Sequence, residues 1–550
     1  MAQMEREHLY GDPGGPKARI AWPWLGRRMA RFLRPAPRVI SRPIEALSFA
    51  LVFTAALILR LATLGDDSLW IDEGYTLAAA DLPLSTLWTV PFDTHPPLHF
   101  TIVKLFSWIG APEWAVRLPS ALFGLATLIP LHLLARRRLG NLGAIVAITV
   151  WALSYTQLVY ANNGRNYTEL IFFLVVALHA LVILAERLAC GDRLRSSGMA
   201  LGGGLYAVGA LGALYSHNTA ILYLFAINAT LCAWQLVNAP RSALAFMLRL
   251  FAFNALPLLL WLPWLTVMLT ATGGFNWLEQ KSVLQALFTL AVTIGPNDVP
   301  APAALVFFAA LAGGWVSVVW RTGLTNLLIG FHLAIFPALI WLVGLVYVPI
   351  YMERIILIAT LGAALAMGAL AARVRPLAAG PGLAALALAA SLASAMAYQL
   401  RGEAQENLGA HLVQDWRQAI ADSETSRRDG PVAFTICDTF SWPVAATYAG
   451  EGRVHVHRPD QYWDMTRDDW TRLYGQSVRD RLETPLGEVT GPTLSPADLH
   501  ERYSRVVFLQ TDIYCQGTEA EQIHSELTGA GFRKARSRDY RGLTAHDFLR

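Results

Sequence analysis

Residues 97–110, PLHFTIVKLFSWIG, decide how many times this chain crosses a membrane. The segment is apolar, but it is short and Lys104 interrupts it. A helix needs about 20 apolar residues to cross a hydrocarbon core of about 30 Å. The length of this segment therefore favours a helix that lies in the interface or re-enters the membrane, and the topology of every later segment depends on that assignment.

The composition indicates a polytopic membrane protein. Of the 550 residues, 54% are hydrophobic and only 15% are charged, whereas a soluble domain has roughly 25% charged residues. This balance excludes a disordered, collagenous or nucleic-acid-binding protein, and a net charge of +4 is too small to indicate an anionic polymer as partner. With residues 97–110 lying flat, about eleven segments are long enough to span: 44–64, 115–135, 143–161, 168–186, 199–216, 219–237, 250–270, 301–320, 326–347, 355–373 and 380–399.

The basic residues predict the orientation of these spans, because cytoplasmic loops of membrane proteins carry an excess of Lys and Arg. In the arrangement with eleven spans, the cluster Arg136, Arg137 and Arg138 falls on the cytoplasmic side. Counting residues 97–110 as a further span would place this cluster outside. We therefore expect a plasma (inner) membrane protein with a cytoplasmic N-terminus and an extracytoplasmic C-terminus.

Three regions follow from this topology. Residues 1–43 form a basic cytoplasmic tail, residues 44–399 a transmembrane domain whose first outer loop covers 65–112, and residues 400–550 an extracytoplasmic domain. In the last region, two short apolar runs, 432–437 and 506–510, predict buried strands, and helical patterns between and after them indicate an α/β domain. Cys437 and Cys515 follow these strands, and both a disulfide and two reduced buried cysteines are compatible with their positions.

Polar residues gather at the predicted outer ends of the spans. Asp72 and Glu73 lie in the first outer loop among aromatic and apolar neighbours, where each ionised group at membrane depth costs about 2.5 to 3.5 kcal/mol. A solvated loop in which Asp72 caps the next helix is the alternative. His95 is compatible with a helix cap or a solvated residue, and equally with a metal ligand or a phosphate contact. Further polar groups occupy residues 160–169, 215–218 and 347–354.

These groups have the chemistry of a lipid-phosphate site. Arg165, Arg354 and His217 can bind an anion, because guanidinium groups pair with phosphate oxygens in a bidentate way. A nearby carboxylate can accept a proton from an attacking hydroxyl. Nucleotide sugars are not available outside the cytoplasm, so an activated sugar there must arrive on a lipid phosphate and no nucleotide cofactor is expected. The sequence therefore predicts a membrane glycosyltransferase.

At these residues the chain resembles the integral-membrane glycosyltransferases of the GT-C fold, in particular the bacterial branch related to protein O-mannosyltransferases and aminoarabinose lipid A transferases. The motifs that carry the resemblance lie between residues 70 and 354. They are Trp70-x-Asp72-Glu73, His95-Pro96-Pro97-Leu98, Val116-Arg117-Leu118-Pro119 continuing to Gly124, Ala135-Arg136-Arg137-Arg138-Leu139-Gly140, Arg165-Asn166-Tyr167 and Glu353-Arg354.

The resemblance implies a role for each site residue. Asp72 is the catalytic carboxylate, and Glu73 assists it or binds a divalent cation. Arg165, Arg354 and His217 correspond to basic residues near the phosphate of the donor. Family members commonly carry Arg-Tyr where this chain has Arg354-Ile355, so Tyr351 is the candidate for the missing tyrosine. His95 and Tyr167 are further candidates for substrate or metal contacts. The candidate site as a whole consists of Asp72, Glu73, His95, Arg165, Tyr167, His217, Tyr351 and Arg354.

The resemblance also implies the partners and the reaction. The donor is a polyprenyl-phosphate sugar, which is itself a lipid of the membrane. The acceptor is a hydroxyl of a cell-envelope glycan, a glycolipid or a protein. Direct displacement at the anomeric carbon predicts inversion of configuration. A metal site formed by Glu73, His95 and His217 requires that the fold bring the three within ligand distance.

Two other functions are compatible with many spans and intramembrane charges. A transporter or lipid flippase of envelope glycan assembly places its binding groups near the midplane, often on broken helices in two repeated halves. Here the polar groups lie at the outer ends of the spans and no clear repeat is visible. A non-catalytic assembly protein would leave the combination of Asp72, His95 and Arg354 unexplained.

Overall fold

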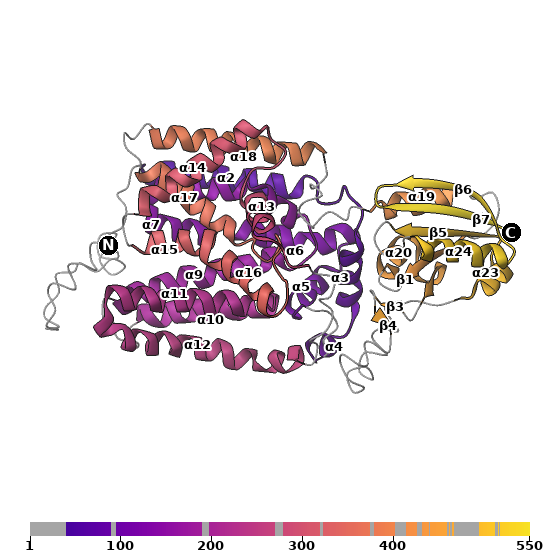
Figure 1. Cartoon of the computed structure of the whole chain (residues 1–550), viewed down its shortest axis with the longest axis horizontal. Helices are drawn as coiled ribbons and strands as arrows, with labels where there is room; N and C mark the ends of the chain where they lie inside the picture. The colour runs from indigo at the N-terminus through magenta and orange to yellow at the C-terminus, as the bar shows by residue number, and fades with distance from the viewer. Residues whose placement is uncertain are drawn as a thin grey trace.

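The computed structural model consists of a helical bundle and a smaller domain with a β-sheet (Figure 1). It describes residues 40–89, 95–189, 197–269, 279–319, 323–373, 379–401, 414–425, 432–438, 441–458, 461–462, 465–466, 494–511, 515 and 517–550. Most of the predicted basic tail, residues 1–39, and Cys190 lie outside the described residues.

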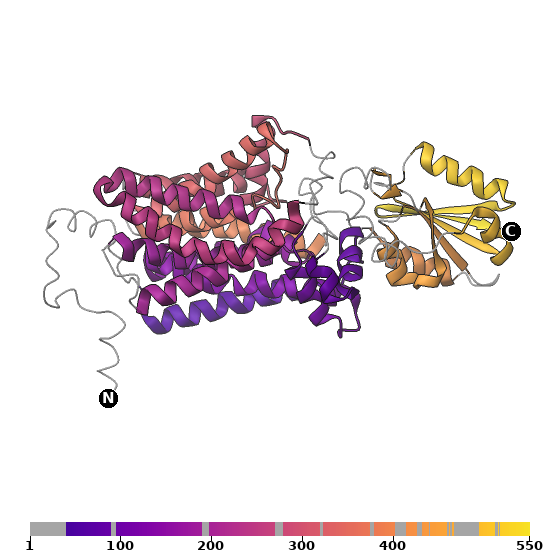
Figure 2. The same ribbon diagram turned by 90° about the horizontal axis from the view of Figure 1, so that it is seen from below.

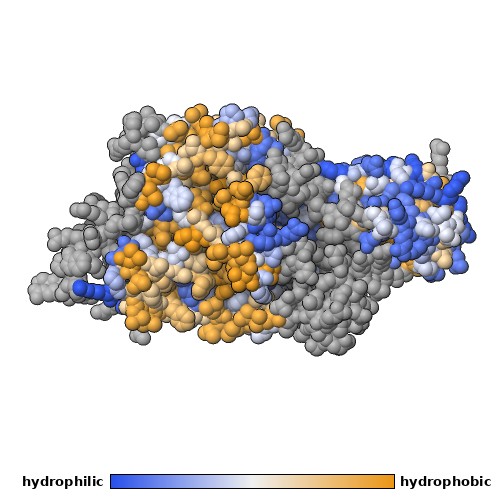
Figure 3. All heavy atoms as spheres, in the orientation of Figure 1, coloured by the Kyte–Doolittle hydropathy of each residue, from blue (hydrophilic) through white to orange (hydrophobic). Residues whose placement is uncertain are grey.

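The bundle contains the long apolar helices. Within the described ranges, nine helical segments are long and apolar enough to cross a membrane. Apolar side chains cover the visible face of the bundle, whereas hydrophilic residues dominate the visible face of the sheet domain (Figure 3). The helices of the bundle that meet this length, or combine to meet it, are α2 (Arg42–Leu61), α6 (Pro112–Ala126), α7 (Leu128–Ala152), α9 (Tyr167–Ala189), α10 (Ser197–Ser216), α11 (Ala220–Asn238), α12 (Pro240–Leu269), α14 (Ala301–Val319), α15 (Leu324–Gly330), the π-helix η1 (Phe331–Ile335), α16 (Phe336–Val346) and α18 (Ala379–Arg401).

One of the nine segments, Pro112–Ala152, contains two passes. Gly140 interrupts α7 with a φ of 79°, a conformation that glycine adopts without steric cost. Arg60, near the end of α2, lies against both Gly124 and Ala152, while the beginning of α2 pairs with Arg136. The chain therefore crosses the bundle, turns back at Gly140 and returns, as the predicted spans 115–135 and 143–161 require.

The predicted span 355–373 differs most from the structure. Its helix, α17 (Ala359–Arg373), has 15 residues and rises by only roughly 22 Å, less than the hydrocarbon thickness. Nearly all of its side chains are buried by neighbouring helices. Pro112–Ala152 corresponds to two of the predicted spans, and α17 to one that is absent from the nine. The nine segments and α17 together therefore match the eleven predicted spans.

Short helices cover the end of the bundle that faces the sheet domain, and Figure 2 shows the earliest of them between the two parts. The segment that decides the topology forms α5 (Leu98–Phe106), which is too short to span and confirms the sequence prediction. The short helices are α3 (Ile71–Asp81), α4 (Leu84–Thr89), α5, α8 (Tyr155–Ala161) and α13 (Val283–Ile294).

The C-terminal domain is an α/β domain, as predicted. Its five-stranded sheet has the order β2-β1-β5-β7-β6, in which β1 pairs in parallel with β2 and β5, and β7 pairs antiparallel with β5 and β6. The strands are β1 (Val432–Asp438), β2 (Val454–Arg458), β5 (Arg505–Thr511), β6 (Arg533–Tyr540) and β7 (Leu543–Leu549), with a separate pair β3 (Gln461–Tyr462) and β4 (Met465–Thr466). The helices are α19 (Trp416–Thr425), α20 (Trp442–Ala449), the 3₁₀ turn η3 (Glu451–Arg453), α23 (Pro496–Arg502) and α24 (Thr518–Gly529).

The two parts share one hydrophobic core. Side chains from α3 and α5, among them Tyr75 and Phe100, belong to the same buried cluster as Trp416 and Val444 of the sheet domain. The backbones also approach closely, because a Cβ added at Gly74 would lie 2.7 Å from the backbone of Val444. The sheet domain is therefore packed on the short helix that carries Asp72.

The structure also decides between the two alternatives for the cysteines. Cys437, near the end of β1, is joined to Cys515, which follows β5, across a sequence separation of 78 residues. Cys232, in α11, is a free cysteine.

We expect the disulfide to be detectable chemically. When the protein is denatured without reductant and alkylated, mass spectrometry should find Cys232 modified and a peptide pair linked through Cys437 and Cys515. Reduction before alkylation should release both as modified thiols. Alkylation of Cys437 and Cys515 without any reductant would contradict the bond.

Candidate active site

The two adjacent carboxylates lie in the first turn of α3, but their environments differ. The helix begins after Trp70, which is its N-cap residue, so the alternative of Asp72 as the cap is not supported. The partial positive charge of a helix N-terminus stabilises acidic residues in the first turn. The side chain of Asp72 is 16% exposed, whereas that of Glu73 is 1% exposed. Only Asp72 retains access to a substrate.

Glu73 is fully engaged by the protein. Its two carboxylate oxygens accept hydrogen bonds from Nε and Nη2 of Arg117, at 2.8 and 2.6 Å. The backbone N–H of Gly164 donates to the same carboxylate at 2.7 Å, and that of Trp70 at 3.3 Å. These bonds make Glu73 a positioning residue that joins α3, α6 and the loop before α9. The expectation that it assists catalysis or binds a cation finds no support in this arrangement.

Arg165 connects Asp72 with the other predicted site residues. Its Nε lies 3.9 Å from a carboxylate oxygen of Asp72. Nη1 donates to the hydroxyl of Thr76, one turn after Asp72, at 3.0 Å, and Nη2 donates to Nδ1 of His95 at 3.1 Å. The predicted pairing of a carboxylate with a guanidinium group is therefore present at the end of the bundle that faces the sheet domain.

Three rings extend this group. The ring centroid of His95 lies 4.9 Å from that of His217 and 6.3 Å from that of Tyr167. Nδ1 of His217 accepts the backbone N–H of Thr219 at 3.1 Å. With Nδ1 as the acceptor in these contacts, Nε2 is the ring nitrogen of His95 and of His217 that is left to donate.

Arg354 completes the group from a distant part of the sequence. Its guanidinium carbon lies 5.9 Å from the ring centroid of Tyr167, within the range of a cation–π interaction. Asp72 and Arg165 are close enough to interact with it electrostatically. The fold thus brings six of the eight predicted site residues together: Asp72, His95, Arg165, Tyr167, His217 and Arg354.

Tyr351 does not have the predicted environment. Its side chain is 5% exposed, and its hydroxyl donates to the backbone carbonyl of Ala286, in α13, at 3.0 Å. In this structure the donor proton of Tyr351 is used to hold α13, and its expected role beside Arg354 stays a prediction.

The structure does not form the metal site that the sequence left open. Among the described residues, no three His, Cys, Asp or Glu side chains are close enough together to hold a metal ion. His95 and His217 lie side by side, but the oxygens of Glu73 are occupied by Arg117 and Gly164. The residues present therefore do not fit a three-ligand site.

The residues that hold the loop before α9 were not identified from the sequence. Nε2 of His99, in α5, lies 3.1 Å from the carbonyl oxygen of Gly164, and its Nδ1 lies 3.2 Å from Glu169. Glu169 also accepts a hydrogen bond from Ser216 at 2.6 Å. Gly164 is thus bound on one side by Glu73 and on the other by His99, which fixes the backbone that presents Arg165.

The sequence contains two signals for these residues. Arg117 and His99 both lie within or directly beside motifs that carry the family resemblance, and both are polar residues in apolar segments. A buried charge in such a segment needs a partner. The sequence does not reveal the partners, because they lie 44 and 70 residues away in the chain.

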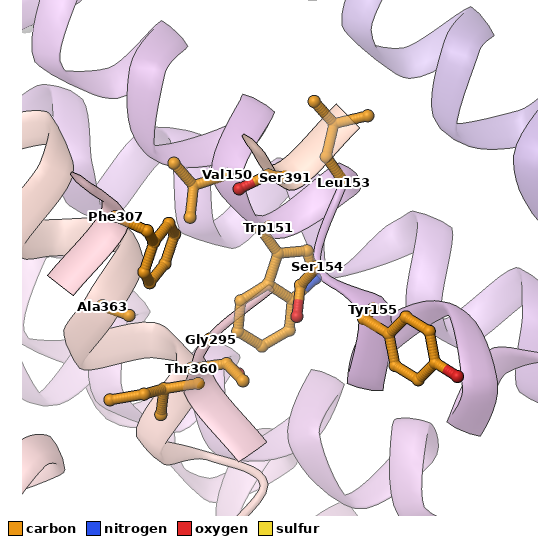
Figure 4. A pocket seen from close by; sticks show the side chains of 11 residues that line it. Val150, Trp151, Leu153, Ser154, Tyr155, Gly295, Phe307, Thr360, Ala363 and Ser391 are labelled. Atoms are coloured by element: carbon orange, nitrogen blue, oxygen red, sulfur yellow. The ribbon is translucent and has the colours of Figure 1, made fainter. Parts of the chain in front are cut away.

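A cavity inside the bundle is not part of this site. Figure 4 shows Trp151, Ser154, Thr360 and Ser391 around a space between α7, α17 and α18. Its volume of about 10 Å³ is close to that of a single water molecule. It is too small for a sugar or a lipid phosphate.

We expect the adjacent carboxylates to differ in their effect on stability. Glu73→Gln should lower the free energy of unfolding by about 3–5 kcal/mol, because it leaves the buried Arg117 without a counter-charge. Asp72→Asn should change it far less, since that side chain is partly exposed and 3.9 Å from Arg165. Thermal unfolding of the two detergent-solubilised variants tests this, and equal stabilities would contradict the positioning role of Glu73.

Comparisons with known proteins agree with this architecture. Residues 94–253 match the family model described as dolichyl-phosphate-mannose-protein mannosyltransferase. The comparison with curated proteins found no significant match.

Solved structures are similar over most of the chain. The crystal structure of ArnT from Cupriavidus metallidurans in the apo state has a TM-score of 0.59 at 13% identity, covering 91% of this chain and 98% of that one. The structure of the same protein bound to undecaprenyl phosphate has a TM-score of 0.59 at 13% identity, covering 90% of this chain and 97% of that one. The structure of an oligosaccharyltransferase from Archaeoglobus fulgidus has a TM-score of 0.48 at 12% identity, covering 91% of this chain and 72% of that one. The chain therefore has the GT-C fold of integral-membrane glycosyltransferases, as its sequence motifs predicted.

Proposed function

We propose that the protein transfers a sugar from a polyprenyl-phosphate carrier to an acceptor hydroxyl on the outer face of the membrane. The observation that carries this proposal is the position of Asp72 beside Arg165 and Arg354 at one end of the bundle. One partly exposed carboxylate next to two guanidinium groups suits a reaction that removes a proton and releases a phosphate. The fold that this chain shares with ArnT, solved with undecaprenyl phosphate, supports a lipid carrier.

In the proposed mechanism, Asp72 accepts the proton of the acceptor hydroxyl as its oxygen attacks the anomeric carbon. The bond from that carbon to the phosphate oxygen breaks, and the lipid phosphate leaves with the electron pair. Arg165 and Arg354 stabilise its charge, with the Nε2–H groups of His95 and His217 as additional donors. Charge stabilisation of this kind is usually the largest contribution to catalysis. A single displacement inverts the configuration.

A second cavity supports a lipid-linked donor. It has a volume of about 170 Å³ and lies between α13 and Glu353, the residue before Arg354. Phe288 and Val292 line it with apolar groups, and Lys281, Gln285, Thr289 and Glu353 line it with polar ones. The side chain of Phe288 is 58% exposed, so the cavity adjoins the bundle surface. We propose that the first isoprene units of the carrier occupy it.

We expect Asp72→Asn to remove sugar transfer while the fold is retained. Loss of a positioned general base costs about 10²- to 10⁴-fold in rate. The parent and the variant are incubated with a panel of polyprenyl-phosphate sugars, and release of polyprenyl phosphate is measured by mass spectrometry. Asp81→Asn, on the exposed end of the same helix, is the matched control and should keep the parental rate.

Undiminished transfer by Asp72→Asn would exclude Asp72 as the base. If the parent released no polyprenyl phosphate from any donor and acceptor, and instead moved the lipid across vesicle membranes, the alternative of a transporter or flippase would replace the proposed function.

We expect turnover to be independent of added divalent cations. Arg165 and Arg354 supply the positive charge beside Asp72, and the described side chains do not form a three-ligand metal site. The parent should therefore keep its rate, within about twofold, after treatment with EDTA and dialysis, as expected when guanidinium groups carry the charge stabilisation. A loss of activity that Mg²⁺ or Mn²⁺ restores would show that a cation takes part.

A further inference from the structure

The connection between α2 and α3, residues 62–70, is held by two arginines from different parts of the molecule. Arg117, in α6, donates to the carbonyl oxygens of Leu64, Asp67 and Ser68 at 3.1, 2.9 and 2.9 Å. Arg417, in α19 of the sheet domain, donates to the two carbonyls between them, that of Gly65 at 3.2 Å and that of Asp66. Five consecutive carbonyls directly before the helix of Asp72 are thus bound by guanidinium groups.

Tyr448 joins the sheet domain to the same connection and to the bundle. Its hydroxyl accepts the backbone N–H of Leu69 at 2.7 Å and donates to the carboxylate of Glu113, in α6, also at 2.7 Å. Arg417 donates to the same carboxylate oxygen of Glu113 at 3.1 Å. Glu113 lies one helical turn before Arg117, so both anchors of the connection are on one face of α6.

Two further contacts close the interface. Arg541, after β6, pairs with the carboxylate of Asp67 at 2.7 Å, and Ser68 donates to the backbone carbonyl of Gln414. Gly74, two residues after Asp72, leaves no space for a side chain against Val444. Residues 65–69 before Asp72 and Gly74 after it therefore all contact the sheet domain.

We propose that the C-terminal domain positions the catalytic carboxylate through Tyr448 and Arg417, which act on Asp72 by fixing residues 64–69. Neither side chain contacts the group formed by Asp72, Arg165 and Arg354. They are positioning residues, and this inference rests on the proposed function of Asp72. A catalytic group displaced by about 1 Å can lose about 100-fold in rate, so a rigid connection immediately before Asp72 affects catalysis.

The test uses Tyr448→Phe in the full chain, with Tyr540→Phe as its matched control. Both hydroxyls belong to the sheet domain and donate to a carboxylate, but Tyr540 donates to Asp422 of the same domain, at 3.0 Å. We expect Tyr448→Phe to lower kcat about tenfold or more at an unchanged KM for the polyprenyl-phosphate sugar, because Arg165 and Arg354 stay in place. Tyr540→Phe should leave both parameters at the parental values.

Hydrogen–deuterium exchange provides a readout that does not depend on activity. Peptides covering residues 62–76 should exchange faster in Tyr448→Phe than in the parent and in Tyr540→Phe. Parental kcat and parental exchange in Tyr448→Phe would overturn the proposal. If the parent transferred no sugar at all, the proposed function would fail, while faster exchange would still support the positioning of this segment and unchanged exchange would overturn it.

Arg417→Gln is the second variant, in case Tyr448→Phe does not fold. The side chain of Arg417 is 44% exposed, and glutamine keeps an amide N–H donor for the carboxylate of Glu113. It should also lower kcat at constant KM and accelerate exchange in residues 62–76. Arg417→Lys should recover part of the rate, because lysine keeps the charge and N–H donors but not the planar two-pronged geometry of the guanidinium group. No change in either variant would contradict the proposal.

Discussion

The buried ion pair between Glu73 and Arg117 is the interaction on which the arrangement of the candidate active site depends. A buried charge pair is favourable only when further hydrogen bonds satisfy the remaining donors and acceptors. Here the carboxylate also accepts N–H groups of Gly164 and Trp70, and the guanidinium group binds three backbone carbonyls. One pair thereby fixes α3, α6 and the loop before α9 relative to one another.

This pair explains how two adjacent carboxylates can have separate roles. Successive residues of a helix point about 100° apart, so Asp72 and Glu73 cannot face the same side. Glu73 faces Arg117 in the interior, and Asp72 faces the group formed by Arg165, His95 and Arg354. Glu73, which stabilises the structure, and Asp72, which is partly exposed, are thus adjacent in the sequence but lie in different environments.

The C-terminal domain is packed against the bundle through a shared core, unlike a separate binding module. Its buried residues, such as Trp416 and Val444, continue the core formed by α3 and α5. Arg417 and Tyr448 meet the bundle at Glu113, and Arg541 meets it at Asp67. The motifs that carry the family resemblance end at residue 354, before this domain. Its contacts place it next to the segment that carries Asp72.

The sequence determined the features that depend on local composition and length. Apolar runs predicted the spans, the shortness of residues 97–110 predicted that α5 does not cross, and Arg136–Arg138 marked the loop between the spans 115–135 and 143–161. The alternation of apolar runs and helical patterns after residue 400 predicted an α/β domain. Motifs in the chain predicted the GT-C fold and gave Asp72, Arg165 and Arg354 as candidate site residues.

Only the tertiary structure decided which polar groups pair with each other. It paired Glu73 with Arg117, bonded the hydroxyl of Tyr351 to the carbonyl of Ala286, and showed that His99, itself bonded to Glu169, holds Gly164. It also joined Cys437 to Cys515. A sequence shows that a charged residue lies in an apolar segment and must be compensated. The identity of its partner depends on contacts between helices tens or hundreds of residues apart, which local pattern and composition do not encode.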